Sequence, residues 1–130
     1  MAFTRSVGLV VLALMTSTST RGQALSPNKL SVDLKTALSL MQQNNCPPAM
    51  SPMVKEACQQ QLSYTSNRLR VLGRVTSTTY LGTQQVRSPS LNRDVPAALF
   101  RVTFQSGGTT TWTIAEDEHG QITVFWTPGF

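Results

Sequence analysis

The chain has 130 residues, of which only 13% are charged, and 11 Lys and Arg stand against six Asp and Glu for a formal net charge of +5. Two of the cations, Arg5 and Arg21, lie within residues 1–24, which leaves nine cations against six acids over residues 25–130, a net charge of about +3. These cations are scattered and are not interleaved with aromatic residues, which excludes a nucleic-acid-binding surface as an interpretation. A mildly basic chain of this kind is compatible with an acidic protein partner or with the anionic bacterial envelope.

The N-terminal segment, residues 1–24, is predicted to be a signal peptide. Arg5 supplies a basic start, residues 6–15 (SVGLVVLALM) are mostly apolar, and residues 22–24 form a small-x-small cleavage site. This apolar run is much shorter than the roughly 20 residues that a membrane-spanning helix needs. We therefore predict an exported protein, periplasmic or secreted, with a single mature domain over residues 25–130 and no stable membrane insertion. An N-terminal anchor that is not cleaved is the alternative.

Two amphipathic helices are predicted after this segment. The first begins at Ser26-Pro27, because serine caps helices well and proline is favoured at the first helical position. Its apolar residues recur at helical spacing: Leu30, Leu34, Ala37, Leu38 and Met41. It ends near Asn44-Asn45, because prolines 47 and 48 cannot continue a helix. The second helix begins at Ser51-Pro52 with the same signal and ends before Gly73.

The two cysteines, Cys46 and Cys58, lie at the end of the first predicted helix and about two turns into the second. In an exported chain an isolated pair is expected to form a disulfide, which would join the two helices across the proline-rich connection. A loop this short gives a stabilisation of about 3 kcal/mol in the chain-closure description. Free thiols are the alternative. A metal site would need further ligands, and the one histidine, His119, lies far along the chain.

Four β-strands are predicted over residues 74–81, 98–105, 109–115 and 121–127, where apolar and polar residues alternate. Gly107-Gly108 and residues 116–120 predict tight turns, and residues 83–96 predict a long loop. Helices followed by consecutive strands indicate an α+β fold, with two N-terminal helices packed on a four-stranded antiparallel sheet.

The alternation assigns residues to the two faces of this sheet. One set is predicted to be buried against the helices: Phe100, Val102, Phe104, Trp112, Ile114, Ile122, Val124 and Trp126. Another set is predicted to project from the open face: Tyr80, Leu99, Arg101, Thr103, Thr111, Thr113 and Phe125. Because Tyr, Phe and Arg are favoured in interface cores, six residues of this second set form the candidate partner-binding face: Tyr80, Leu99, Arg101, Thr103, Thr113 and Phe125.

Spaced hydrophobic residues and glycines in the second half of the chain resemble a known family. The residues that carry the resemblance are Leu72-Gly73, Ser77, Tyr80-Leu81-Gly82, the run FRVTF at 100–104, Trp112-Thr113-Ile114, and residues 117–122 with Gly120. They resemble the small C-terminal domain of exported bacterial serine hydrolases of the β-lactamase-related type, which is similar to the nuclear transport factor 2-like (cystatin-like) superfamily. The resemblance covers roughly Ser51 to Thr127. It implies an α+β fold and association through the open sheet face, and it carries no catalytic motif.

The sequence offers no catalytic set and no cofactor motif. His119 lies in an acidic turn, and Glu116-Asp117-Glu118 lacks the spacing of a calcium-binding loop. Asp33 and Glu56 lie on separate helices, and nothing in the sequence pairs either with a second catalytic group. We therefore predict no catalytic residue, no metal and no cofactor.

Three functions follow as hypotheses. The first is an exported non-catalytic binding or accessory module that acts through the open sheet face, as a homodimer or with an envelope protein. The second is a periplasmic inhibitor or immunity-type protein that blocks an enzyme. The third is a small-molecule pocket between helices and sheet, lined by Phe100, Trp112 and Trp126.

Overall fold

The computed structural model describes residues 26–129, so the predicted signal peptide lies outside the described residues. Two helices precede four strands: α2 (Pro27–Gln42), α3 (Pro52–Leu72), β2 (Val75–Ser88), β3 (Arg93–Phe104), β4 (Thr109–Glu116) and β5 (Ile122–Trp126). The strands form one antiparallel sheet in the order β2-β3-β4-β5. The predicted class, α+β with two helices packed on a four-stranded antiparallel sheet, is confirmed.

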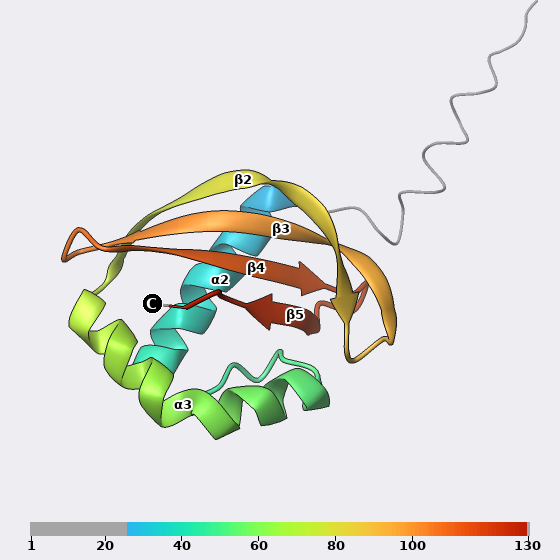
Figure 1. The fold of residues 1–130 in the computed structure, drawn as a ribbon, viewed down its shortest axis with the longest axis horizontal. Helices are drawn as coiled ribbons and strands as arrows, with labels where there is room; N and C mark the ends of the chain where they lie inside the picture. Colours follow the sequence, from blue (N-terminus) through green and yellow to red (C-terminus); the bar gives the residue numbers. More distant parts are fainter. Residues whose placement is uncertain (1–25, 130) are drawn as a thin grey trace, which may run out of the picture.

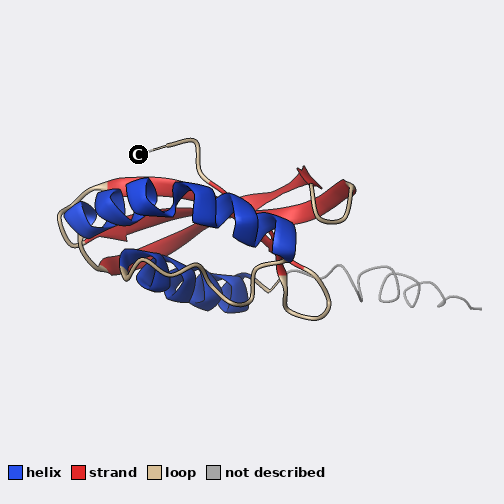
Figure 2. Cartoon of the chain, turned by 90° about the horizontal axis from the view of Figure 1, so that it is seen from below, coloured by secondary structure: helices blue, strands red, loops and turns tan. Residues whose placement is uncertain are grey.

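The two helices cover one side and one edge of this sheet. Figure 1 shows α2 crossing behind the strands and α3 running below β5, the last strand of the sheet. In the view from below, α3 lies in front of the strands and α2 runs alongside it (Figure 2). Their C-terminal ends are joined by hydrogen bonds, since the Gln42 side chain donates to the carbonyls of Leu69 (3.0 Å) and Gly73 (2.6 Å). The open face of the sheet is thus turned away from α2.

The helix boundaries follow the predicted signals. Pro27 begins α2, and the Ser26 hydroxyl accepts a hydrogen bond from the Lys29 amide at 3.4 Å. All five apolar residues of the predicted stripe are buried. Pro52 begins α3, but the Ser51 hydroxyl makes no capping bond and instead lies 2.5 Å from the hydroxyl of Ser90. The serine-proline pairs therefore mark both helix starts, although the second serine serves a tertiary contact.

A disulfide joins Cys46 to Cys58, with 6.2 Å between their Cα atoms. Cys46 follows α2 and Cys58 lies within α3, so the bridge links the helices across the proline-containing connection. Both half-cystines are partly buried against the main core. The predicted pairing is confirmed.

The main core lies between the helices and the face of the sheet that they cover, which we call the helix-covered face. Strands β3 and β4 contribute alternate residues to it: Ala98, Phe100, Val102, Phe104, Trp112 and Ile114. The helices contribute Leu30, Leu34, Leu38, Met41, Val54 and Leu69. Burying this many large apolar side chains is the main stabilising contribution to a domain of this size.

The predicted loop over residues 83–96 is wrong, because most of it is strand. Residues 83–88 of β2 pair with residues 93–98 of β3, which leaves only Pro89–Asn92 as the connecting turn. Pro96 is tolerated within β3 because the residues of β3 before Ala98 pair with β2 only. This part of β3 is therefore an edge, where a missing amide hydrogen leaves no partner unsatisfied. Asn92 takes the left-handed conformation (φ +53°) that the turn requires and that asparagine tolerates.

The predicted faces of β5 are also wrong, because β5 contains a β-bulge. Ala115 pairs with Val124 and Glu116 with Ile122, so Thr123 is an extra residue. The bulge reverses the alternation, as bulges do. Phe125 consequently pairs with Ile114 on the helix-covered face, while Trp126, predicted to be buried, is 59% exposed on the open face.

Tyr80 requires a similar correction. It pairs with Phe100, so it lies toward the helix-covered face and not on the open face as predicted. Its ring contacts that of Phe100 at a tilt of 55°, with a centroid separation of 5.7 Å, although it remains 43% exposed. Irregularities in β2 near Thr76 and Leu81 break the simple period of two that the prediction assumed.

The far ends of β2 and β3 curl over the open face. Figure 1 shows β2 descending in front of the start of β5. There the Ser88 hydroxyl, fully buried, donates to the carbonyl of Thr123 at 3.1 Å. This curl encloses a second, smaller apolar cluster, with Val95, Ala97, Ala115 and Val124 buried and Val86 and Leu91 packed against them. The sheet is therefore concave on its open side at this end.

Candidate functional site

The predicted partner-binding face is only partly assembled. Leu99, Arg101 and Thr103 lie together on the open face of β3, and Arg101 is exposed between Thr79 of β2 and Thr111 of β4. Thr113 lies on the same face but is buried, with 2% of its surface exposed. Tyr80 and Phe125 lie on the other face. The polar stretch around Arg101 is thus an open surface without the aromatic residues that were expected beside it.

A groove lies between α3 and β5, with a cavity volume of about 640 Å³. We call it the α3–β5 groove. Residues 53–65 of α3 form one wall, and residues 123–126 of β5 with Thr127 after it form the other. The far end of β2, from Gln84 to Arg87, and Pro89 in the turn after it close one side. Because β5 is the last strand, the groove follows its outer edge and takes residues from both faces of the sheet.

The walls of the groove are mainly apolar. Met50, Met53 and Val54 contribute from α3 and the segment before it, and Trp112, Phe125 and Trp126 contribute from the sheet. The rings of Trp112 and Phe125 are in contact at a tilt of 38°, with a centroid separation of 5.0 Å, so they form one continuous aromatic wall. Met53 and Trp126 are 55% and 59% exposed, which places them at the mouth of the groove. Methionine and tryptophan supply an adaptable apolar surface for a ligand.

Two of the three predicted pocket residues line this groove, and one does not. Trp112 and Trp126 are part of the lining, whereas Phe100 is 1% exposed in the main core and contributes nothing to it. The wall formed by α3 and the side formed by β2 were not predicted. Residues 84–89 were assigned to a loop, and no periodicity in the sequence relates them to β5.

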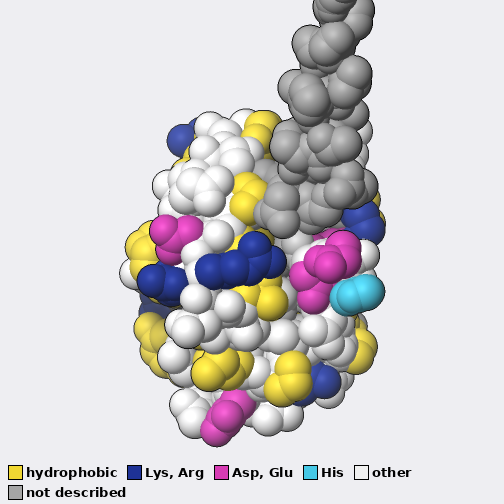
Figure 3. Space-filling model, turned by 90° about the vertical axis from the view of Figure 1, so that its right-hand side faces the viewer, with side chains coloured by type: hydrophobic (Ala, Val, Ile, Leu, Met, Phe, Trp, Pro, Cys, Tyr) yellow, Lys and Arg dark blue, Asp and Glu magenta, His cyan; other side chains and the backbone are white. Residues whose placement is uncertain are grey.

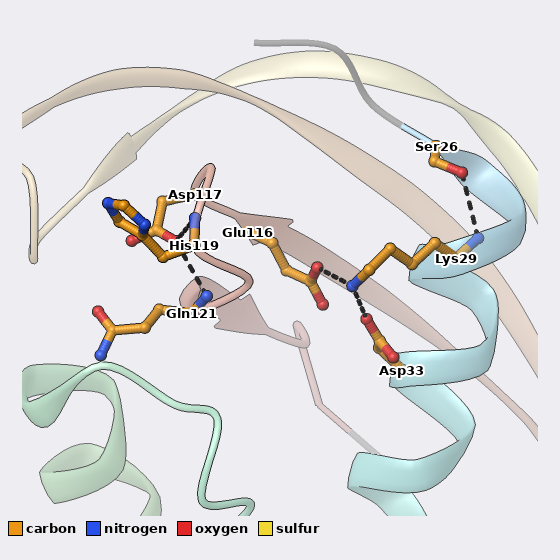
Figure 4. Close-up of polar contacts among 7 residues, drawn as sticks. All are labelled: Ser26, Lys29, Asp33, Glu116, Asp117, His119 and Gln121. Atoms are coloured by element: carbon orange, nitrogen blue, oxygen red, sulfur yellow. Dashed lines mark hydrogen bonds and ion pairs between the residues drawn. The ribbon is translucent and has the colours of Figure 1, made fainter. Parts of the chain in front are cut away.

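A charged cluster lies elsewhere, where the first turns of α2 meet the end of β4. Lys29 Nζ donates to Asp33 Oδ2 and to Glu116 Oε1, each at 2.7 Å. Figure 4 shows the lysine pointing between the two carboxyl groups. The Glu116 side chain is only 9% exposed, while that of Asp33 is 31% exposed. Sequence reasoning missed this cluster, because 87 residues separate Lys29 from Glu116.

The cluster holds two carboxyl groups against one ammonium group, and their pKa values diverge. Burial, followed by the hydrogen bond with Asp33, raises the pKa of Glu116 from its ordinary 4.5 to about 7, against the opposing effect of Lys29. The pKa of Asp33 is held below its ordinary value, because Glu116 and then Lys29 donate hydrogen bonds to it. The same two carboxyls raise the pKa of Lys29. Glu116 is therefore the carboxyl that retains a proton near neutral pH.

Perturbed carboxyl groups are candidates for acid–base chemistry when they lie in a cleft. Glu116 and Asp33 do not line the α3–β5 groove. Their contacts instead join α2 to β4, which is the geometry of a structural ion-pair network. We assign the cluster to the stability of the fold.

The acidic turn between β4 and β5 is built around Asp117. Its Oδ1 accepts hydrogen bonds from the backbone amides of His119 and Gln121, both at 2.9 Å (Figure 4). Glu118 and His119 are exposed. Within residues 26–129 no group of three or more His, Cys, Asp and Glu side chains is arranged to hold a metal ion. The three acidic residues here thus have different environments: Glu116 binds Lys29, Asp117 accepts from the amides of the turn, and Glu118 is exposed.

The charges at this end of the molecule are mixed in sign. Figure 3 shows basic side chains next to acidic ones on the side that it presents, so this side has no uniformly basic face. Neither α2 nor α3 combines the length and apolar character that a membrane-spanning helix requires. Comparisons with protein-family models, with curated proteins and with solved structures find no match to the chain. The resemblance to the nuclear transport factor 2-like superfamily therefore stays a prediction.

Proposed function

We propose that this protein is a non-catalytic binding module that holds an apolar small molecule in the α3–β5 groove. The observation that carries the proposal is the groove itself, a hollow of about 640 Å³ with methionine and tryptophan walls. Small-molecule sites typically have volumes of about 300–1,000 Å³, apolar and aromatic walls and a few polar groups. The groove has all three properties.

We further propose that the protein acts outside the cytoplasm. Its Cys46–Cys58 disulfide supports this, because such bonds persist in oxidising compartments. The predicted signal peptide over residues 1–24 agrees with it. Thiol labelling of protein recovered from the envelope or the medium tests this point, and two freely reactive thiols would contradict it.

Ligand binding can be measured directly, because both tryptophans line the groove. We expect native mass spectrometry of the purified protein to detect a co-purified small molecule. We also expect an apolar fluorescent dye to bind and to quench the tryptophan emission. Met53→Gln should weaken dye binding, since it places a polar amide at the mouth of the groove.

The matched control is Val32→Gln. Val32 is 58% exposed on α2 and does not line the groove, so this variant should bind the dye as the wild type does. Equal dye affinity in wild type and Met53→Gln, together with ligand-free mass spectra, would contradict the proposed function.

The second candidate is association through the open face around Arg101, as a homodimer or with an envelope protein. The observation that favours it is an exposed arginine between two threonines, with the half-buried Leu99 next to it on β3 and the exposed Trp126 on the same face two strands away. Arginine and tryptophan are enriched in interface hot spots. Light scattering should then detect a dimer that Arg101→Glu dissociates. A wild-type protein that is monomeric at all concentrations and recovers no partner in a pull-down would exclude this candidate.

A further inference from the structure

The charge of the α3–β5 groove is one-sided. Arg87, near the end of β2, is part of the lining, and none of the described acidic residues is. Its closest acid is Asp94, whose carboxylate lies 3.7 Å from Arg87 Nε, and both side chains are 65% exposed. An ion pair this exposed is weak, so it leaves the guanidinium able to bind another anion. A guanidinium group also has five N–H donors, and the contact with Asp94 leaves most of them available.

The groove also contains an unsatisfied polar atom. Thr113 is 2% exposed and lines the groove, yet its Oγ1 has no hydrogen-bond partner among residues 26–129. A buried hydroxyl without a partner is unfavourable, because it loses its bonds to water and gains none from the protein. Thr113 pairs with Leu99 on one side and Trp126 on the other, so an apolar surface surrounds this single hydroxyl. The Oγ1 atom itself has almost no accessible surface, so a polar group of a ligand satisfies it only when the Thr113 side chain rotates toward the groove.

From these two observations we propose that the groove binds an amphipathic carboxylate, a molecule with an apolar chain or ring and one anionic group. The inference rests on the proposed function and adds the class of ligand. The apolar part contacts the wall of Met53, Trp112 and Trp126, where burial of its surface supplies most of the affinity. The carboxylate pairs with Arg87, whose planar fork suits a carboxylate, and the Thr113 side chain rotates so that its hydroxyl donates to the ligand.

The test compares three probes with the same twelve-carbon chain: dodecanoate, 1-dodecanol and dodecylammonium, each below its micelle concentration. Binding is measured by tryptophan fluorescence and by calorimetry on the purified protein. We expect dodecanoate to bind most tightly and dodecylammonium most weakly. Arg87→Gln should lower the affinity for dodecanoate by about tenfold and leave that for dodecanol unchanged, because only the ionic contact is removed.

Arg93→Gln is the matched control, because Arg93 is an exposed arginine on the adjacent strand that does not line the groove. It should bind all three probes as the wild type does. Arg87→Lys supplies a second variant that keeps the charge but loses the bidentate geometry, and it should have an intermediate affinity for dodecanoate. Circular dichroism confirms that each variant is folded.

The outcomes separate the inference from the proposed function. Equal binding of dodecanoate and dodecanol, tighter binding of dodecylammonium, or an unchanged affinity in Arg87→Gln would overturn the carboxylate inference and leave an apolar groove. Failure of all three probes and of the apolar dye to bind the wild type would overturn both.

Discussion

At the scale of single residues, two buried threonines of β4 illustrate opposite uses of a hydroxyl. Thr110 Oγ1 accepts a hydrogen bond from Trp112 Nε1 at 2.6 Å, in the interior. Thr113 Oγ1, three residues on, has no partner within the described residues. A buried hydroxyl contributes modestly to stability when it is hydrogen-bonded and lowers stability when it is not. The same side chain therefore stabilises the fold at one position and lowers its stability at the other.

This difference predicts the behaviour of two isosteric variants. Thr113→Val should raise the free energy of unfolding by about 1 kcal/mol, because it removes a buried hydroxyl that lacks a partner. Thr110→Val should lower it by about 1–2 kcal/mol, because the indole loses its acceptor. Urea denaturation of both variants measures these changes. A loss of stability in Thr113→Val as large as that in Thr110→Val would show that the Thr113 hydroxyl is bonded in solution.

At the scale of elements, the sequence predicts regular segments well and their extensions poorly. The starts of both helices and the centres of all four strands were predictable, because capping residues, prolines and alternation act locally. The extension of the β2–β3 hairpin was not predictable from the sequence. Pro96 and the polar residues around it are typical of a loop, and only the pairing with the partner strand shows that they form a strand. The faces of β5 were mispredicted for a related reason, because the bulge at Thr123 depends on β4 and on Ser88, and neither leaves a local signal in β5. Of the three predicted pocket residues only Phe100 fails, because the main core buries it.

The contact between α2 and β4 depends on pH through Glu116. Its pKa in the fold is about 7 and its ordinary value is 4.5, so between these values the folded protein binds more protons than the unfolded chain. Stability should therefore fall as the pH rises from about 4.5 through 7, and it should change little through this group at higher pH. Asp33 titrates below this window and Lys29 above it, since the pKa of the first is lowered and that of the second is raised.

Glu116→Gln provides the comparison, since it keeps the shape of the side chain but cannot ionise. Its melting temperature should change less between pH 5.5 and 8.5 than that of the wild type. Glu118→Gln is the control, because Glu118 lies in the same turn but is exposed. If the Glu116→Gln variant and the wild type lose the same stability over this range, another group governs the pH dependence.

At the scale of the whole molecule, the open side of the sheet is enclosed at one end and free at the other. The curled hairpin covers the cluster of Val95, Ala97, Ala115 and Val124, whereas the surface around Arg101 stays exposed. The hydrogen bond from the Ser88 hydroxyl to the carbonyl of Thr123 holds the closed end in place. Because the hairpin also supplies one side of the α3–β5 groove, the shape of the groove depends on this contact.

Ser88→Ala should open the closed end. The substitution leaves the buried Thr123 carbonyl without this donor and removes the acceptor of the Leu91 amide, so we expect a loss of about 1–3 kcal/mol. Hydrogen exchange should accelerate in residues 86–95, and ligand affinity in the groove should fall. Ser77→Ala, at an exposed position of the same strand, should change stability by less than about 0.5 kcal/mol. Equal exchange rates in the two variants would show that the Ser88 hydroxyl does not hold the hairpin in place.

The extra residue in β5 has a consequence for chains descended from a common ancestor with this one. A relative that lacked one residue at the position of Thr123 could keep every helix, every strand and the order of the sheet. Ile122 and Val124 would then be adjacent and would keep the opposite faces that they occupy here, so the rest of the strand would face as it does now. The deletion would remove Thr123 itself, a buried lining residue of the groove, together with the carbonyl that accepts from the Ser88 hydroxyl. In such a lineage, a change in strand length alone would free the end of the hairpin and reshape the groove, while the fold and the faces of β5 were inherited unchanged.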